Sequence, residues 1–115
     1  MVSSTFHKLM KTGVTNEAVE VSRTPCQLYG YSINNPNVYS IFVQIFDESD
    51  VDAIEVGVTD WALSILVPAG GAVVLRDGAT FGIPMEHGCC VAVTRGESSD
   101  VAPATALNVV MFVGI

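Results

Sequence analysis

Positive charge is scarce in this sequence, and charge of either sign is sparse. The 115 residues include five Lys and Arg against twelve Asp and Glu, for a formal net charge of −7, and only 15% of the residues are charged. Proteins hold a phosphate backbone mainly through Lys and Arg side chains that displace its counterions. The charge balance therefore argues against nucleic acid as a partner.

Long apolar runs are absent, although half of the residues are hydrophobic. No stretch approaches the roughly 20 apolar residues that a membrane-spanning helix needs, so we expect no membrane partner. The opening segment MVSSTFHKLMKTG holds Lys but no continuous apolar stretch before a small-residue cleavage site, unlike a secretory signal. We expect the chain to be made and used without export.

Cysteine and histidine are few. The three cysteines, Cys26, Cys89 and Cys90, are an odd number, and two adjacent cysteines close a disulfide only through a strained ring. We expect all three to be reduced and buried, in a chain matured in a reducing compartment. The two histidines, His7 and His87, belong to no paired-histidine motif, so we predict no metal site.

Catalytic signatures are missing as well. The sequence has no Gly-rich phosphate loop and no Gly-x-Ser-x-Gly elbow. Cys89 and Cys90 stand near His87, but the alternation in CCVAV places them in a strand with at least one thiol in the core. The acids between 47 and 60 include DVDAIEVG, which lacks the glycine and final Glu of a calcium loop. We predict no catalytic, cofactor-binding or metal-binding residue and a solvated acidic loop, although paired carboxylates in this loop stay open.

Short apolar segments rich in Val, Ile, Phe and Tyr recur from Ala18 onward, between clusters of Pro, Gly, Asn and Asp. This spacing is typical of antiparallel β-structure. We predict an all-β protein with a single antiparallel β-sandwich, jelly-roll-like, over residues 18–115. Residues 1–17 mix small, polar and basic residues without a helical stripe, so we predict an extended N-terminal arm there. The predicted strands are 18–22, 27–33, 39–47, 61–67, 72–76, 80–83, 89–94 and 107–113.

The strand predicted at 39–47 is apolar on both faces. By the period-2 rule its odd positions fall on one face, and the other face carries Phe42 and Phe46. The last strand repeats the pattern with Val110 and Phe112. Because an isolated two-layer sandwich should have polar outer faces, something must cover these side chains. We predict that these four residues contact another subunit; the alternative is that the arm or a long loop of the same chain covers them.

Three segments stand in a distinctive order: CQLYGYSINNPNVYSIFVQIFD, then LVPAGGAVVL, then FGIPMEHGCCVAVTRGESSDVAPATALNVVMFVG. They contain an LYG strand before an Asn turn, a strand ending in FD, a P-x-GG turn, a VAVTRG segment and a Ser-Asp-Ala-Thr loop before the final strand. In this order the chain from about residue 26 to its end resembles the small β-sandwich structural proteins of tailed-bacteriophage virions. Cys89 and Cys90 are not part of that pattern.

The resemblance implies a virion component rather than an enzyme, most concretely a capsid decoration or cement protein. Such a protein binds the major capsid protein on the outer capsid surface and bridges neighbouring capsomers, after assembly in the host bacterial cytoplasm. A homotrimer would match a capsid three-fold axis, and an arm can add a strand to a neighbour's edge. We predict Thr5, Phe6, His7, Leu9 and Met10 as arm contacts, and Phe42, Phe46, Val110 and Phe112 as subunit or capsid contacts.

A phage tail, baseplate or fibre component is the alternative within the virion. Trp61, Tyr29, Tyr31 and Tyr39 would then form a sugar-stacking platform for host-surface glycans, although burial is the usual fate of a Trp in a small sandwich. An enzyme on the same scaffold, a hydrolase or a metal-dependent isomerase, is a further alternative.

Overall fold

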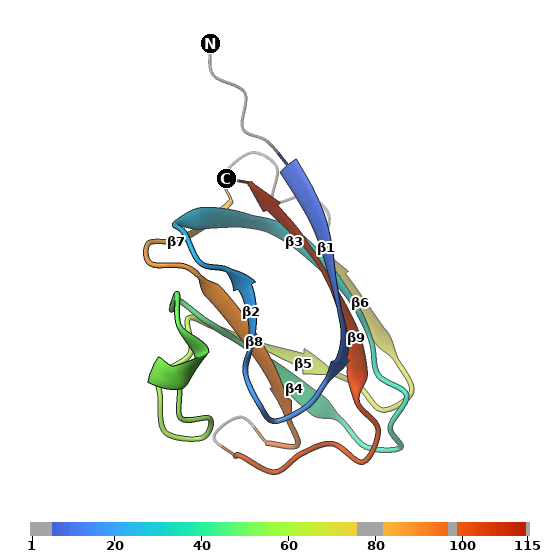
Figure 1. Cartoon of the computed structure of the whole chain (residues 1–115). Helices are drawn as coiled ribbons and strands as arrows, with labels where there is room; N and C mark the ends of the chain where they lie inside the picture. The colour runs from blue at the N-terminus through green and yellow to red at the C-terminus, as the bar shows by residue number, and fades with distance from the viewer. Residues whose placement is uncertain (1–5, 76–81, 97–98, 115) are drawn as a thin grey trace.

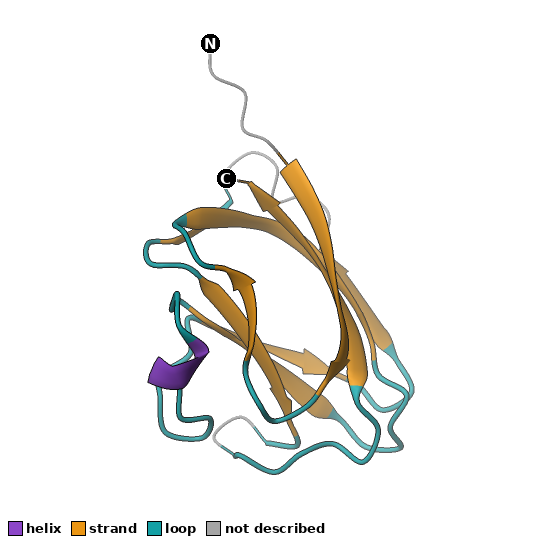
Figure 2. Cartoon of the chain, viewed as in Figure 1, coloured by secondary structure: helices purple, strands orange, loops and turns teal. Residues whose placement is uncertain are grey.

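Two antiparallel β-sheets packed face to face make up the computed structural model (Figure 1). The structure describes residues 6–75, 82–96 and 99–114. Within these residues the only helical segment is a short 3₁₀ turn, η1 (Val51–Ala53), purple in Figure 2, and no described helix has the length and apolar character to cross a membrane. The strands are β1 (Phe6–Val14), β2 (Val19–Ser22), β3 (Cys26–Asn34), β4 (Ile41–Phe46), β5 (Leu63–Val67), β6 (Ala72–Leu75), β7 (Ile83–Met85), β8 (Cys89–Thr94) and β9 (Leu107–Gly114).

The strand order is that of a jelly roll. The first sheet runs β1-β9-β3-β6, with β7 also paired to β3, and the second sheet runs β2-β8-β4-β5. Consecutive strands alternate between the sheets, apart from the β4–β5 pair and from β6 and β7, which share one edge of β3. Every pairing is antiparallel. The predicted all-β antiparallel sandwich is therefore confirmed, with jelly-roll winding.

The core lies between the two sheets and is filled by alternate residues of each strand. In β9 the odd positions are buried, while Asn108, Val110 and Phe112 face the other way. The same alternation in β4 sends Ile41, Val43 and Ile45 inward. This packing leaves each sheet with an outer face, and the two outer faces differ in how far the chain itself covers them. The fully buried core residues include Leu28, Ile33, Ile41, Val43, Ile45, Val67, Val91, Val93, Val109, Met111 and Val113.

Most strands lie within two residues of their predicted positions. The strand predicted at 80–83 is the exception, since the described strand there is Ile83–Met85 and residues 76–81 lie outside the described part of the chain. Pro84 fits inside β7 because β7 pairs on one side only, with β3, so the missing N–H breaks no second ladder.

The N-terminal segment is extended, as predicted, but it is not a separate arm. Residues 6–14 form β1, which pairs with β9 of the same chain from Phe6 opposite Gly114 to Val14 opposite Leu107. Val14 is fully buried in the main core. Gly13 has a φ of 64° next to the irregularity in the ladder, a conformation that glycine adopts without a steric penalty. The predicted boundary at residue 17 is therefore wrong for these residues.

The INNPN turn carries the chain from β3 in the first sheet to β4 in the second. The Asn35 side chain donates to the carbonyl oxygens of Tyr39, Val67 and Pro68 at 2.8, 3.2 and 3.1 Å. Its Oδ1 accepts from the backbone N and Nδ2 of Asn37 at 2.9 and 3.0 Å. Asn37 in turn bonds both backbone groups of Thr105. Two buried amides thus join three connections of the sandwich.

Candidate functional site

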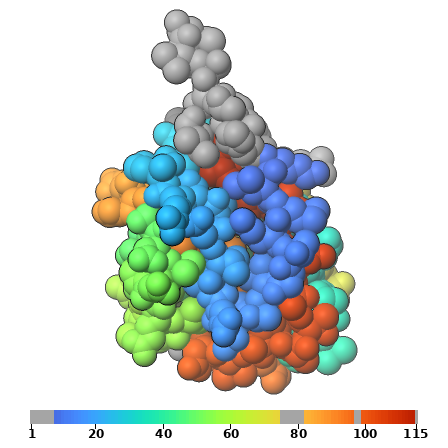
Figure 3. Space-filling model, in the orientation of Figure 1, coloured from blue at the N-terminus to red at the C-terminus, as the bar shows by residue number. Residues whose placement is uncertain are grey.

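The outer face of the second sheet is partly covered by the chain itself. Phe46 is fully buried, and with Cys90 and Ala92 it forms a small second core. The segment 47–60, between β4 and β5, packs Val51 and Ile54 against this core. Figure 3 shows this segment, in green, lying against β2 in light blue. The prediction that Phe46 is a subunit or capsid contact is therefore wrong, because a loop of the same chain already covers it.

The acidic segment is amphipathic rather than uniformly solvated. Val51, Ile54 and Val56 pack inward, whereas Asp50, Asp52 and Glu55 are exposed. The Asp50 carboxylate caps the 3₁₀ turn by accepting from the N–H of Asp52 at 2.9 Å. One segment therefore both shields an apolar sheet face and presents exposed negative charge to the solvent.

Asp47 fixes the start of this segment to the turn between β7 and β8. Its Oδ1 accepts from the backbone N of His87 at 2.8 Å, and the His87 ring Nδ1 lies 3.6 Å away. Partial burial acts to raise the pKa of Asp47, but the backbone N–H groups of residues 86–88 and the His87 ring outweigh it and hold the pKa below its ordinary value. The carboxylate form is thus the one the fold stabilises.

Replacing Asp47 with Asn is expected to lower the free energy of unfolding at pH 7 by roughly 1 kcal/mol, because a charge-assisted acceptor becomes a neutral one. A lowered folded-state pKa contributes stability that is full above the unfolded carboxyl pKa, about 3.9, and is lost as the pH falls through the folded value. Urea unfolding at pH 7 and pH 3 should therefore show the variant and the wild type converging at the lower pH.

The matched control for Asp47→Asn is Asp52→Asn, which changes an exposed carboxylate of the same segment. We expect that control to shift the free energy of unfolding by less than about 0.5 kcal/mol. Equal losses in the two variants, or a constant loss for Asp47→Asn across the pH range, would contradict the anchoring role of Asp47.

The outer face of the first sheet carries a row of apolar side chains, two of which stay about half exposed in the described structure. Met10 of β1 lies opposite Val110 of β9. Val110 also lies opposite Ser32 of β3, which in turn lies opposite Val74 of β6. Met10 and Val74 are 55% and 50% exposed. We call these four residues the outer row; it crosses β1, β9, β3 and β6 of this five-stranded sheet (Figure 1).

Phe112 extends the outer row along β9, on the same face as Val110. It lies opposite Lys8 of β1 and Gly30 of β3 and is half-buried. Gly30 has no side chain, so this part of the face is flat beside the ring. The outer face of the first sheet therefore combines an aromatic ring, three aliphatic or thioether side chains and one hydroxyl with the exposed polar side chains of Lys8, Asn34 and Asn108.

The first sheet carries no carboxylate on its described strands. Lys8 and Lys11 lie on β1, whereas the described acids lie on β2 and in the connections between strands. In a chain with a formal net charge of −7, this face is where a second negatively charged molecule meets the least repulsion. The sequence already shows that these strands contain no acids. Only the strand order shows that they lie side by side in one sheet.

The predicted contact residues fall into separate places. Val110 and Phe112 share the outer face of the first sheet. Phe42 is half-buried on the outer face of the second sheet, opposite Leu66, which is 52% exposed. Hence the four predicted subunit contacts do not form one surface.

The predicted arm contacts are also divided. Leu9 packs against the main core, and Met10 joins the outer row. The backbones of Phe6 and His7 pair in β1, while Thr5 and the side chains of Phe6 and His7 lie outside the described residues. Sequence reasoning missed this strand because only every second residue of an edge strand faces the core.

The four aromatic residues considered for a glycan platform are dispersed. Tyr29 is at a bulge in β3, where Leu28 pairs with Val113 and Gly30 with Phe112. Tyr31 packs against the main core. The Tyr39 hydroxyl accepts from the N–H of Ala104 at 2.6 Å, and the Arg95 guanidinium lies 3.8 Å from its ring centre. Trp61, 37% exposed, precedes β5 of the second sheet. These rings make no common stacking surface.

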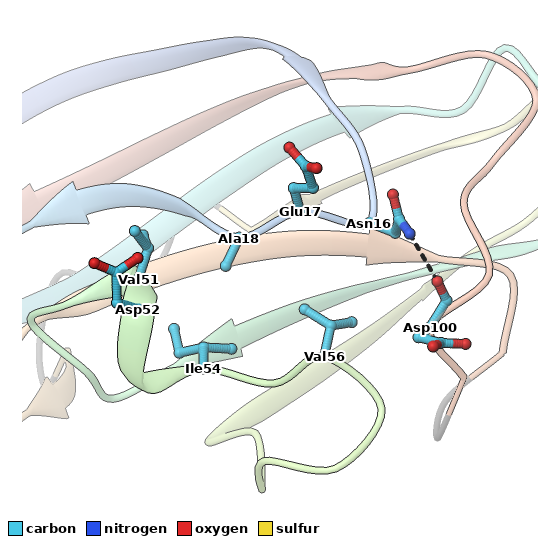
Figure 4. Close-up of a pocket in the computed structure, with 8 residues that line it drawn as sticks. All are labelled: Asn16, Glu17, Ala18, Val51, Asp52, Ile54, Val56 and Asp100. Carbon is cyan, nitrogen blue, oxygen red and sulfur yellow. Dashed lines mark hydrogen bonds between the residues drawn. The ribbon is translucent and has the colours of Figure 1, made fainter.

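A shallow hollow of about 440 Å³ lies between the β1–β2 connection and the 51–56 part of the acidic segment (Figure 4). The Asn16 side chain donates to the carbonyl of Asp100 at 2.8 Å at its edge. Figure 4 shows the three lining carboxylates pointing in different directions, so they do not form a general acid and base pair. The lining residues are Asn16, Glu17, Ala18, Val51, Asp52, Ile54, Val56 and Asp100.

All three cysteines are buried and free, as the sequence predicted. Burial raises the pKa of the Cys90 thiol to about 11, helped by the negative charges of Glu20, Glu48 and Asp50. No group of three or more His, Cys, Asp or Glu side chains in the described part of the chain is arranged to hold a metal ion.

Comparisons with protein-family models, with curated proteins and with solved structures found no match to this chain.

Proposed function

We propose that this protein is a structural component that works by binding another protein surface. More particularly, we propose a bacteriophage capsid decoration protein, which binds the outer capsid surface and stabilises the shell by bridging neighbouring capsomers. The observation that supports the binding role is the outer face of the first sheet, which carries no acid on its described strands and presents the apolar side chains of Met10, Val74, Val110 and Phe112. The virion setting rests on the sequence resemblance described above.

The energetic argument concerns what this face gains on association. Burying about 400 Å² of apolar area at roughly 25 cal/mol per Å² contributes on the order of 10 kcal/mol before association costs. In a monomer Met10 and Val74 stay about half exposed, so the free energy of burying them is not gained. We propose that a second copy of the chain covers the face, because the first sheet is where two copies of a strongly acidic molecule approach with least repulsion.

A closed oligomer suits the capsid role. A homotrimer would place the same contacts three times around a capsid three-fold axis. Several modest contacts made by one oligomer raise the overall avidity by roughly 10² to 10⁴ over a single contact. Residues 1–5, which precede β1, then extend the contact with the major capsid protein, in keeping with the predicted role of Thr5.

The test is cryo-electron microscopy of purified particles of the phage that encodes the chain. We expect jelly-roll density on the outer shell, at positions between capsomers, with the outer row buried between copies. Density on the tail or baseplate would overturn the capsid assignment in favour of the tail alternative. Particles that lack the protein altogether would overturn the virion role.

A further inference from the structure

The three cysteines divide between the two faces of β8. Cys89, the first residue of the strand, faces the main core and is fully buried there together with Cys26 of β3. Cys90 faces the opposite way, into the small core under the acidic segment, where its thiol donates to the carbonyl oxygen of Glu48 at 3.2 Å. Cys89 and Cys90, which are adjacent in the sequence, therefore lie in different cores. Cys26 and Cys89, which are far apart in the sequence, lie in the same one.

The backbone pairing explains how Cys26 and Cys89 meet. Ser22 at the end of β2 pairs with Cys89 of β8, and Met85 at the end of β7 pairs with Cys26 of β3. The short connections 22–26 and 85–89 both cross from one sheet to the other at this corner of the sandwich. Each of the two thiols shifts the pKa of the other, which indicates that the sulfurs lie close together across the corner, one on each sheet.

The Ser22 hydroxyl fixes the first of these connections. It donates to the carbonyl oxygen of Thr24 at 2.9 Å and accepts from the backbone N–H of Thr24 at 3.3 Å. The other connection is held by packing, since a Cβ at Gly88 would lie 2.7 Å from the Ser22 carbonyl oxygen. Gly88 therefore packs closely against the end of β2, which brings Cys89 next to the connection that leads to Cys26.

We propose that Cys26 and Cys89 are a redox-active dithiol, which a small-molecule disulfide such as glutathione disulfide converts to a disulfide bond between the two sheets, while Cys90 remains a free thiol. This inference does not depend on the proposed capsid role. It would give the protein a covalent link once it leaves a reducing compartment.

The reaction is an ordinary thiol–disulfide exchange in two steps. The Cys26 thiolate attacks one sulfur of glutathione disulfide, which forms a mixed disulfide and releases one glutathione thiolate. The Cys89 sulfur, after losing its proton to solvent, attacks the Cys26 sulfur and displaces the second glutathione. The protein loses two hydrogens and two electrons, and the glutathione disulfide is reduced to two glutathione molecules.

The environments of the two thiols match these separate roles. The interaction with Cys89 holds the pKa of Cys26 below the ordinary thiol value, while the same interaction and burial raise the pKa of Cys89. Cys26 is also the less buried of the two, at 6% exposed against 0%. It lies beside β7, an edge strand of three residues, where local opening admits a reagent most easily.

The test uses the full-length protein in glutathione buffers of increasing oxidised fraction. We expect the number of thiols titrated after denaturation to fall from three to one, the intact mass to fall by two hydrogen atoms, and peptide mapping to join Cys26 to Cys89. The oxidised protein should unfold at a temperature several degrees higher, because the link restricts the unfolded chain. Three thiols remaining under oxidising conditions, or a mapped bond that includes Cys90, would overturn the proposal.

Two variants supply the controls. Cys90→Ser should still form the bond and end with no free thiol, whereas Cys26→Ser should form no bond within the chain. The peptide map of the wild-type protein decides the question even if a variant fails to fold. A Cys26→Ser protein that still loses two thiols on oxidation without dimerising would show that Cys89 pairs with Cys90 instead.

Discussion

Replacing Asn35 with Ala is expected to lower the free energy of unfolding by about 3 kcal/mol, which is the largest single-residue effect we predict. The side chain is 2% exposed and serves carbonyl groups of three different residues. Its loss would leave the buried carbonyl of Val67 and the buried side-chain amide of Asn37 without this partner, along with the partly buried carbonyls of Tyr39 and Pro68. A buried polar group without a partner costs its full desolvation penalty. Urea unfolding monitored by circular dichroism measures the effect.

Asn34→Ala is the matched control, because Asn34 is the neighbouring residue of the same type and is exposed. We expect it to change the free energy of unfolding by no more than about 0.5 kcal/mol. Asn35→Asp should also destabilise the protein, since the carboxylate keeps the shape but removes the donor group. A loss below about 1 kcal/mol for Asn35→Ala would mean that the amide network is not what fixes this corner.

Substituting Glu for both Met10 and Val74 is expected to weaken self-association at least roughly 100-fold, or about 3 kcal/mol, because unpaired charges would be buried between copies. The two residues stand at the ends of the outer row and are about half exposed in one chain, so the fold should tolerate the change. Sedimentation equilibrium gives the association constant, and circular dichroism confirms that the variant is folded.

Leu66→Glu is the control for the outer row, since Leu66 is similarly exposed but lies on the second sheet beside Phe42. It should leave the association constant unchanged. Dissociation caused by Leu66→Glu and not by the outer-row variant would move the interface to the second sheet and restore Phe42 as a contact. A wild-type protein that is monomeric at high concentration would contradict the proposed interface on either sheet.

Strand β4 shows which features of the structure the sequence could predict and which it could not. Alternation of side chains identified Phe42 and Phe46 as facing away from the core, and both do so. It could not tell that Val51 and Ile54 pack over the cluster that contains Phe46, a cluster to which Phe42 does not belong. Covering depends on the path of a connection through space, and period-2 alternation describes only the strand itself.

Strand β1 shows a second feature that the sequence could not predict. Residues 6–14 read as an arm because Lys and Thr interrupt their apolar positions. Within the sheet these polar residues suit an edge, where charged side chains discourage unwanted pairing. What makes the segment a strand is the free edge of β9, formed by residues about a hundred positions away. The composition of residues 6–14 alone therefore does not predict their pairing with β9.

The sequence by itself determined the layered β architecture, the reversal at the paired asparagines and the opposite directions of Cys89 and Cys90, since each follows from side-chain alternation or turn chemistry among near neighbours. Only the tertiary structure decided that β1 joins the sandwich, that one outer face is shielded while the other is open, and that Cys26 meets Cys89. Those outcomes depend on which distant strands lie side by side, and jelly-roll winding makes nearly all such neighbours non-local.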